Sequence, residues 1–171
     1  VDPELQAAQG IEDSIELHIQ QTYDGGDRVG NLELITVLCE NALDSIHWLE
    51  DLGCEFKQTI TTVIGATWPR THYPVNSIGS DFILPLEAAC EEMGQEIIVN
   101  MEAKELIVSD GRVVGVIAED TATGTPYEFK AEKGVILATG GFAADIERCR
   151  SYNPNIPEDI TTSNHPGGTG D

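Results

Sequence analysis

The chain has 171 residues, of which 30 are acidic and 9 are basic, so its net charge is −21, and 40% of its residues are hydrophobic. This charge argues against binding to nucleic acid or to an anionic membrane, because both attract clustered Lys and Arg. No apolar run approaches the roughly 20 residues that are needed to cross a bilayer. The simplest interpretation is a strongly solvated surface, and the alternative is attraction of a cationic partner.

The cysteines carry no metal-binding signature. They are widely spaced, without a CxxC or Cys/His pattern, so we predict no zinc site and no disulfide framework. Cys39 and Cys90 fall on apolar helix faces and are expected to be small core residues. No signal peptide is visible, and the sequence leaves the localisation undecided.

The first half of the chain is expected to be mainly helical. Asp13, followed by Glu16, is typical of a capping box and predicts a first helix that the glycines of residues 24–27 end. Asn31 is expected to cap a second helix, in which apolar residues recur at helical spacing as far as Leu49.

The end of this second helix and a third helix are also predicted. Gly53 suits the C-terminal cap of the second helix. The third helix is expected to end at residues 91–94. Pro85 marks either the first turn of this helix or a kink, because proline does not suit a helix interior.

A long polar loop is predicted from Thr59 to Gly79, and it contains Trp68, Arg70 and His72. Long loops inside a compact domain are uncommon and are often functional. Arg70 suits binding of a carboxylate or phosphate, and His72 suits proton transfer. The alternative is structural: the aromatic residues anchor the loop to the core, and Arg70 pairs with a nearby carboxylate.

The second half of the chain has the pattern of β-strands. A short apolar strand is predicted at residues 96–100. Three further strands are expected to form an antiparallel meander, because Asp110-Gly111 between the first two is a strong hairpin signal. These three strands are predicted at residues 105–109, 113–119 and 127–131.

Two glycine-rich segments follow the meander. A buried parallel strand is predicted at residues 135–138, and it leads into Thr139-Gly140-Gly141. Residues 163–171 contain a second glycine cluster, whose backbone N–H groups suit a pyrophosphate or a sugar. The alternatives are a tight turn into a helix near Asp145 and a flexible tail. The order of elements predicts an α/β nucleotide-binding domain.

The same segments carry a family resemblance. KGVILATGGF at residues 133–142, a Tyr-x-Pro segment and TSNHPGGTGD resemble the fumarate reductase/succinate dehydrogenase flavoproteins, in particular flavocytochrome c fumarate reductases and urocanate reductases. Residues 10–14, 44–49 and 70–72 fit the same family pattern, so the resemblance covers nearly the whole chain.

The resemblance implies FAD as the cofactor, bound in a Rossmann-like α/β domain that includes the N-terminal helices and the meander. It implies that Thr139 and Gly140 contact the dinucleotide and that Asp171 contacts its ribityl or phosphate part. Ala103, in the loop after the strand at residues 97–99, is implied on the adenine side. No catalytic residue and no metal ligand is assigned.

The family's N-terminal GxGxxG and its capping domain have no counterpart in the sequence. We therefore expect residues 1–171 to be a partial FAD-binding domain and an internal fragment of a larger protein. Its expected parts are a helical segment 1–94, a strand and meander segment 95–141, and a linker and glycine loop 142–171.

The expected function belongs to the parent protein. The resemblance implies an oxidoreductase that reduces an activated C=C bond in a fumarate-like small-molecule substrate by hydride transfer from the flavin, with a separate electron donor. The fragment itself is expected to be inactive and to bind FAD weakly or not at all. The alternative is a non-catalytic scaffold that forms a homo-oligomer through uncovered apolar surface.

Overall fold

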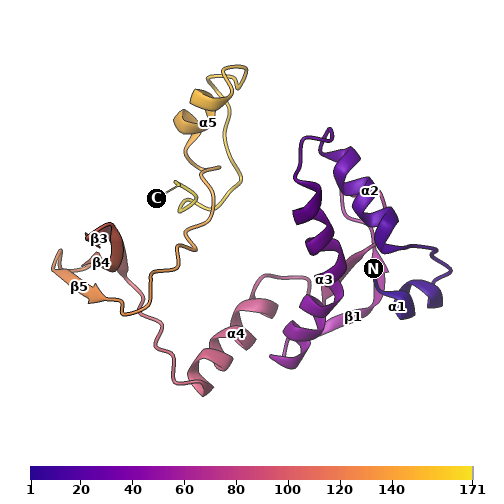
Figure 1. The fold of residues 1–171 in the computed structure, drawn as a ribbon, viewed down its shortest axis with the longest axis horizontal. Coiled ribbons are helices and arrows are strands. Elements are labelled where there is room, and N and C mark those ends of the chain that lie inside the picture. The colour runs from indigo at the N-terminus through magenta and orange to yellow at the C-terminus, as the bar shows by residue number, and fades with distance from the viewer. Residues whose placement is uncertain (171) are drawn as a thin grey trace. The chain divides into compact units, whose positions relative to one another are not determined.

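The computed structural model describes residues 1–170, which form two compact units, one from Val1 to Ile97 and one that begins at Ile98. Four helices and a two-stranded sheet make up the first unit, and a three-stranded sheet and one helix belong to the second (Figure 1). Mixed helices and antiparallel sheets confirm the predicted α/β fold class.

The first three helices are α1 (Pro3–Ala8), α2 (Ile15–Gly25) and α3 (Leu32–Asp51). Asn31 caps α3 as predicted, because its Oδ1 accepts the amide hydrogens of Glu33 and Leu34 at 2.9 and 3.2 Å. The predicted capping box at Asp13 is wrong by one residue. Ser14 caps α2, with its Oγ accepting from the Leu17 amide at 3.1 Å, and this leaves the Asp13 carboxylate for a different partner.

Gly53 and Pro85 show how the next two elements are built. Gly53 follows the last turn of α3 with φ of 94°, a conformation that glycine adopts without a steric cost, which confirms its predicted role. Helix α4 (Ser80–Glu92) ends where predicted but contains Pro85 in its interior, beyond its first turn. The proline lacks the amide hydrogen that the Asp81 carbonyl would otherwise accept.

A β-hairpin occupies much of the predicted loop. Strands β1 (Phe56–Thr61) and β2 (Thr71–Pro74) pair antiparallel, so the irregular segment is shorter than the predicted range of residues 59–79. The core of this unit contains Cys39, Cys54, Phe56 and Ile60, all at most 7% exposed. Cys39 is therefore a core residue as predicted, whereas Cys90 is only half-buried.

The second unit contains the predicted meander. Strands β3 (Met101–Ser109), β4 (Arg112–Asp120) and β5 (Pro126–Lys130) pair antiparallel in that order. The turn between β3 and β4 has φ of 49° at Asp110 and 77° at Gly111. Two successive positive φ values are typical of a type I′ hairpin. The hairpin turn predicted at Asp110-Gly111 is therefore confirmed.

The two apolar strands predicted at residues 96–100 and 135–138 are not formed. Both segments are irregular and unpaired in the described residues, and their apolar side chains are exposed: Val99 is 71% exposed and Ile136 is 93% exposed. A β-strand is stable only when a neighbouring strand accepts and donates its backbone hydrogen bonds. The described sheets offer neither segment such a neighbour.

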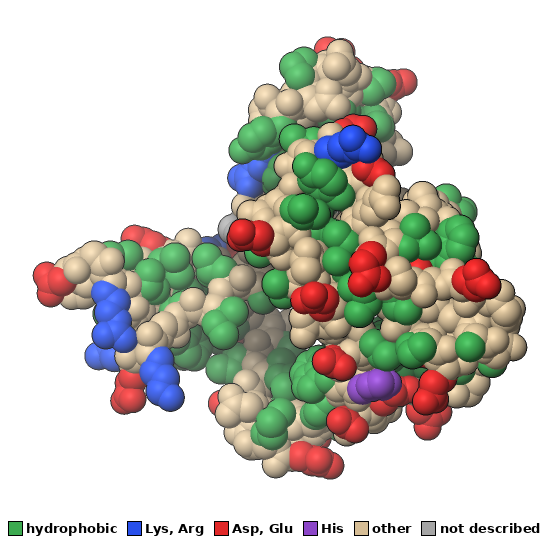
Figure 2. All heavy atoms as spheres, turned by 45° about the vertical axis from the view of Figure 1, so that its right-hand side comes forward, with side chains coloured by type: hydrophobic (Ala, Val, Ile, Leu, Met, Phe, Trp, Pro, Cys, Tyr) green, Lys and Arg blue, Asp and Glu red, His purple; other side chains and the backbone are tan. Residues whose placement is uncertain are grey.

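The surface reflects the composition. Asp and Glu side chains are spread over the visible face in Figure 2, and apolar side chains lie between them. Among the described helices, none is both long enough and apolar enough to cross a membrane.

Candidate cofactor-binding site

Helix α5 (Ile146–Tyr152) organises the two glycine-rich segments of the second unit. Asp145 caps it, because its Oδ1 accepts the Arg148 amide hydrogen at 2.9 Å, which confirms the predicted helix near Asp145. The first glycine segment enters this helix and the second follows it in the chain. The helix therefore sets the direction in which the chain leaves the first segment and returns toward it.

Three hydrogen bonds link the returning chain, helix α5 and residues 142–144, which directly follow the first segment. The Ala144 amide donates to the Gly168 carbonyl at 2.8 Å. Arg148 donates from Nη1 to the Gly170 carbonyl, and the Cys149 thiol donates to the Phe142 carbonyl at 3.4 Å. Segments more than twenty residues apart are thus held side by side by backbone carbonyls and by α5 side chains.

A cavity of about 200 Å³ lies between the two segments. Its lining includes Thr139 and Gly140, the two predicted cofactor-binding residues that the structure brings together. Gly140 has φ of 78°, which favours glycine, and a Cβ there would meet no atom within 4 Å. The complete lining is Thr139, Gly140, Gly141, Ala143, Asn164, His165, Gly167 and Gly168.

The backbone of the first segment is suited to a polar ligand. Within residues 1–170, the amides of Gly140 and Gly141 donate to no protein acceptor. Backbone N–H groups in such turns bind anionic and hydroxyl groups, as the phosphates and sugars of a dinucleotide require. The residues present therefore fit part of a dinucleotide, although the cavity is smaller than the roughly 300–1,000 Å³ of a complete ligand pocket.

Of the other two predicted site residues, the structure describes only Ala103. Ala103 is on β3, opposite Ala118 of β4, and it does not line the cavity. Asp171 lies outside the described residues. Asn164, His165, Gly167 and Gly168 line the cavity but were not among the predicted binding residues, although the sequence motif that contains them was recognised. The signal for these residues was the pair of glycines two and three positions after the histidine.

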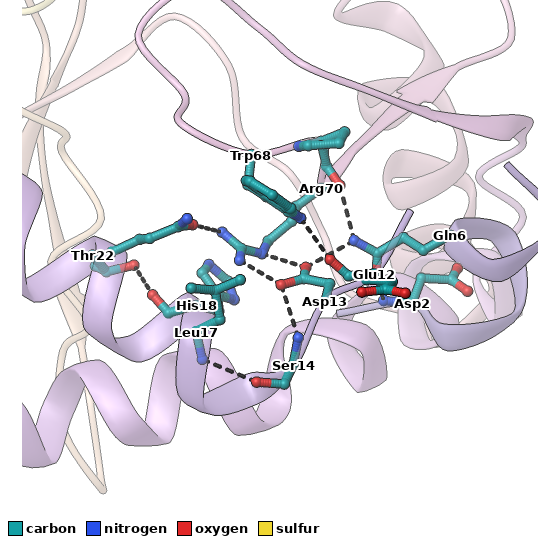
Figure 3. Close-up of polar contacts among 12 residues, drawn as sticks. Asp2, Gln6, Glu12, Asp13, Ser14, Leu17, His18, Thr22, Trp68 and Arg70 are labelled. Carbon is teal, nitrogen blue, oxygen red and sulfur yellow. Dashed lines mark hydrogen bonds and ion pairs between the residues drawn. The ribbon is translucent and has the colours of Figure 1, made fainter. Parts of the chain in front are cut away.

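A second polar cluster surrounds Arg70 in the first unit (Figure 3). Its guanidinium contacts both Asp13 oxygens at 2.6 Å and donates to Gln21 Oε1 at 2.8 Å. Gln6 donates to Asp13 Oδ2 at 2.8 Å and to the Pro69 carbonyl at 2.9 Å. The side chains of Arg70 and Asp13 are 13% and 1% exposed, so this ion pair is nearly dry.

The loop around Arg70 is therefore anchored, as the structural alternative proposed. Trp68 Nε1 donates to the Glu12 carbonyl at 3.1 Å, and His72 Nε2 lies 3.0 Å from Asp2 Oδ2. Arg70 is paired with a carboxylate from α2's entry segment, and that carboxylate neutralises its charge. The cluster fastens the hairpin to the helices and leaves no unpaired cation for a ligand at Arg70.

The pKa values follow from this geometry. Burial raises the pKa of Asp13, but hydrogen bonds from Arg70, Gln6 and the Ser14 amide outweigh it, so the net pKa lies below its ordinary value. Burial lowers the pKa of His18, and the positive charges of Arg70 and the N-terminus lower it further. The cluster thus favours a charged Asp13 and a neutral His18.

Glycine-rich backbone that follows an extended segment and surrounds a cavity beside a helix is characteristic of nucleotide-cofactor binding domains. The sequence matches the FAD binding domain family over residues 2–171. The chain belongs to this family, and FAD is the cofactor of the family.

Two relatives illustrate the similarity. The chain is 38% identical to the urocanate reductase of Eggerthella lenta over 98% of its own length, and it covers 28% of that protein. It is 36% identical to the NADH:acrylate oxidoreductase of Vibrio harveyi over 93% of its own length, and it covers 17% of that protein. The chain therefore spans less than a third of either relative.

Two solved structures have a similar fold. The open conformation of a flavocytochrome c3 fumarate reductase gives a TM-score of 0.85 at 34% identity, covering 99% of this chain and 30% of that one. The 3-ketosteroid-Δ4-(5α)-dehydrogenase of Rhodococcus jostii RHA1 gives a TM-score of 0.79 at 25% identity, covering 96% of this chain and 40% of that one.

Proposed function

We propose that this chain forms one wall of the FAD site in an oxidoreductase that reduces an activated C=C bond in a fumarate-like substrate. The observation that carries the proposal is the pairing of residues 139–141 with residues 164–168 around one cavity. Membership of the FAD binding domain family and similarity to proteins named as urocanate, acrylate and fumarate reductases support it.

In this proposal the chain's residues bind and orient the cofactor. Gly140 and Gly141 present backbone amides to the polar groups of FAD, and the absence of side chains lets the ligand approach closely. Thr139 and Asp171 and, more loosely, Ala103 remain proposed FAD contacts. When bound, the flavin supplies hydride to the double bond, while the protein supplies orientation and electrostatics.

Catalytic groups, the substrate and the electron donor are assigned to other parts of the proposed parent protein. The chain by itself is proposed to be inactive. Its cavity of about 200 Å³ is too small to enclose a dinucleotide, so one wall provides only part of the binding free energy.

The proposal predicts weak but localised FAD binding by residues 1–171. In an NMR titration, we expect FAD to shift the amide signals of residues 139–141 and 164–168, with a dissociation constant of about 0.1–1 mM. Replacing Gly141 with valine places a side chain where a Cβ meets no protein atom within 4 Å, so the fold tolerates it. The valine fills the ligand space and is expected to weaken these shifts by about tenfold or more.

Gly134→Val is the matched control for this titration. Gly134 is equally unobstructed and does not line the cavity, so this variant is expected to retain the shifts. Shifts confined to the first unit, or equal losses in both variants, contradict the proposed site. A stoichiometric yellow complex contradicts the expectation that the isolated chain binds FAD weakly.

A second candidate function is self-association as a non-catalytic scaffold. One observation favours it: α3 exposes Leu34, Leu38 and Trp48 at 68%, 61% and 57%, at positions four and then ten residues apart. Such spacing places them along one side of the helix, and apolar surface of this kind is typical of interfaces.

If α3 mediates self-association, sedimentation velocity of the isolated chain shows a sedimentation coefficient that rises with concentration. Replacing Leu34 and Leu38 with glutamate is expected to abolish this rise, because burying two carboxylates without partners is costly. The control replaces Ile83 and Leu84 of α4, which are 63% and 62% exposed, with glutamate. A monomer at every concentration, or equal effects of the two pairs, rules out the α3 interface.

A further inference from the structure

His165 contacts the glycine turn of the proposed cofactor wall through both its side chain and its backbone. The Gly167 amide donates to His165 Nδ1 at 2.7 Å, and the Gly168 amide donates to the His165 carbonyl at 3.0 Å. The Gly168 carbonyl in turn accepts from Ala144 at 2.8 Å. One residue thus sets the shape of the turn that closes against the first glycine segment.

The turn needs glycine at position 167 because of the imidazole ring. A Cβ at Gly167 would overlap His165 Cε1 and would lie 3.1 Å from Nδ1. A Cβ at Gly168 would meet only ordinary contacts, the nearest being the His165 carbonyl at 3.4 Å. The imidazole ring therefore occupies the space that a side chain at position 167 would need. A side chain at position 168 would not overlap the ring.

The hydrogen bond also fixes the tautomer of the ring. Nδ1 accepts a hydrogen from Gly167 only when it carries none itself, so this contact needs the ring hydrogen on Nε2. On helix α5, Asp145 and Arg148 pair with each other at 3.5 Å, and Arg148 also reaches the Gly170 carbonyl.

We propose that His165 is a positioning residue of the FAD site: its imidazole holds the Gly167-Gly168 turn in the shape that receives the cofactor. This inference rests on the proposed function for its cofactor. His165 thus acts on the cofactor through the backbone of Gly167 and Gly168.

The first test needs no cofactor. In the isolated chain, NMR detects a nitrogen–nitrogen coupling across the hydrogen bond between Gly167 and His165 Nδ1, together with the Nε2–H tautomer of the ring. Both signals are expected near neutral pH. Their absence near neutral pH overturns the inference, whether or not FAD binds.

The second test uses FAD as the probe in the same titration. His165→Ala removes the acceptor and is expected to weaken binding by about three- to tenfold, the effect of one hydrogen bond. His165→Asn is the rescue variant, because an asparagine side chain accepts from the amide two residues later. It is expected to bind FAD like the original chain.

Double substitution separates positioning from simple structural damage. Gly167→Ala is expected to weaken FAD binding, whereas in the His165→Ala background the same change costs little, because the ring it would overlap is gone. Additive effects, or FAD binding by His165→Asn as weak as that of His165→Ala, overturn the inference. If FAD shifts none of the amide signals of residues 139–141 and 164–168, the proposed function is wrong. The coupling measurement then still tests the geometry of His165.

Discussion

Replacing Asp13 with alanine is expected to lower the free energy of unfolding by about 3–5 kcal/mol, the range measured when one partner of a buried ion pair is removed. Arg70 would keep its charge in a site where its side chain is only 13% exposed, and Gln6 would lose one of its acceptors. Urea unfolding followed by tryptophan fluorescence measures this, because both tryptophans, Trp48 and Trp68, lie in the first unit.

The exposed pair Arg28–Asp24 provides the control. Its contact is equally short at 2.7 Å, but its side chains are 69% and 40% exposed, so Asp24→Ala is expected to change stability by at most about 1 kcal/mol. Replacing both Asp13 and Arg70 with apolar residues is expected to recover part of the loss. Equal costs for Asp13→Ala and Asp24→Ala would show that burial does not govern the pair.

Because of the same cluster, the stability of the first unit is expected to decline as the pH falls. The pKa of Asp13 is lower in the fold than its ordinary value of 3.8. The ionised carboxylate therefore stabilises the fold fully above pH 3.8, and this stabilisation is lost as the pH falls through the lower pKa of the folded state. His18 acts in the same direction. Its pKa is also lowered from 6.5, so the unfolded chain binds the proton more readily and stability declines as the pH falls below 6.5.

Local signals in the sequence were sufficient for the elements that local chemistry determines. Asn31 caps α3, and Asp110-Gly111 forms the hairpin turn, because each acts on backbone groups within a few residues. The segments at residues 96–100 and 135–138 have equally clear β-strand patterns but form no strand. Pairing depends on a neighbouring strand, which a pattern within the segment does not supply.

The candidate site was likewise predictable only where its signal was local in the sequence. The glycines at positions 140 and 141 were identified because glycine after an apolar segment has a direct backbone meaning. The role of His165 depends on a hydrogen bond to the amide two residues later, and a histidine gives no pattern that indicates this. The Arg70 contact spans 57 residues, so only the structure could identify Asp13 as its partner.

A second large effect is expected at Gly115 in the middle of β4, which pairs with β3 on one side and β5 on the other. A Cβ there would overlap the Phe129 carbonyl oxygen of β5 and would lie 3.2 Å from Ile107 Cδ1. Gly115→Ala is therefore expected to destabilise the meander by about 3 kcal/mol, at the upper end for an overpacked site. Hydrogen exchange of the β4 and β5 amides measures the loss.

Backbone entropy alone predicts that Gly115→Ala stabilises the meander. The sign of the measured stability change therefore distinguishes this effect from the steric one. Gly115 has no positive φ, and replacing such a glycine with alanine at an unstrained, open position stabilises a protein by about 0.4–1 kcal/mol. Gly134→Ala provides that case, since its Cβ would meet nothing within 4 Å. Shortening Ile107 to alanine should not rescue Gly115→Ala, because the main obstacle is a backbone carbonyl that no rotamer change removes. Increased protection in Gly115→Ala, or full rescue by the shortened side chain, would refute the close approach of β4 and β5.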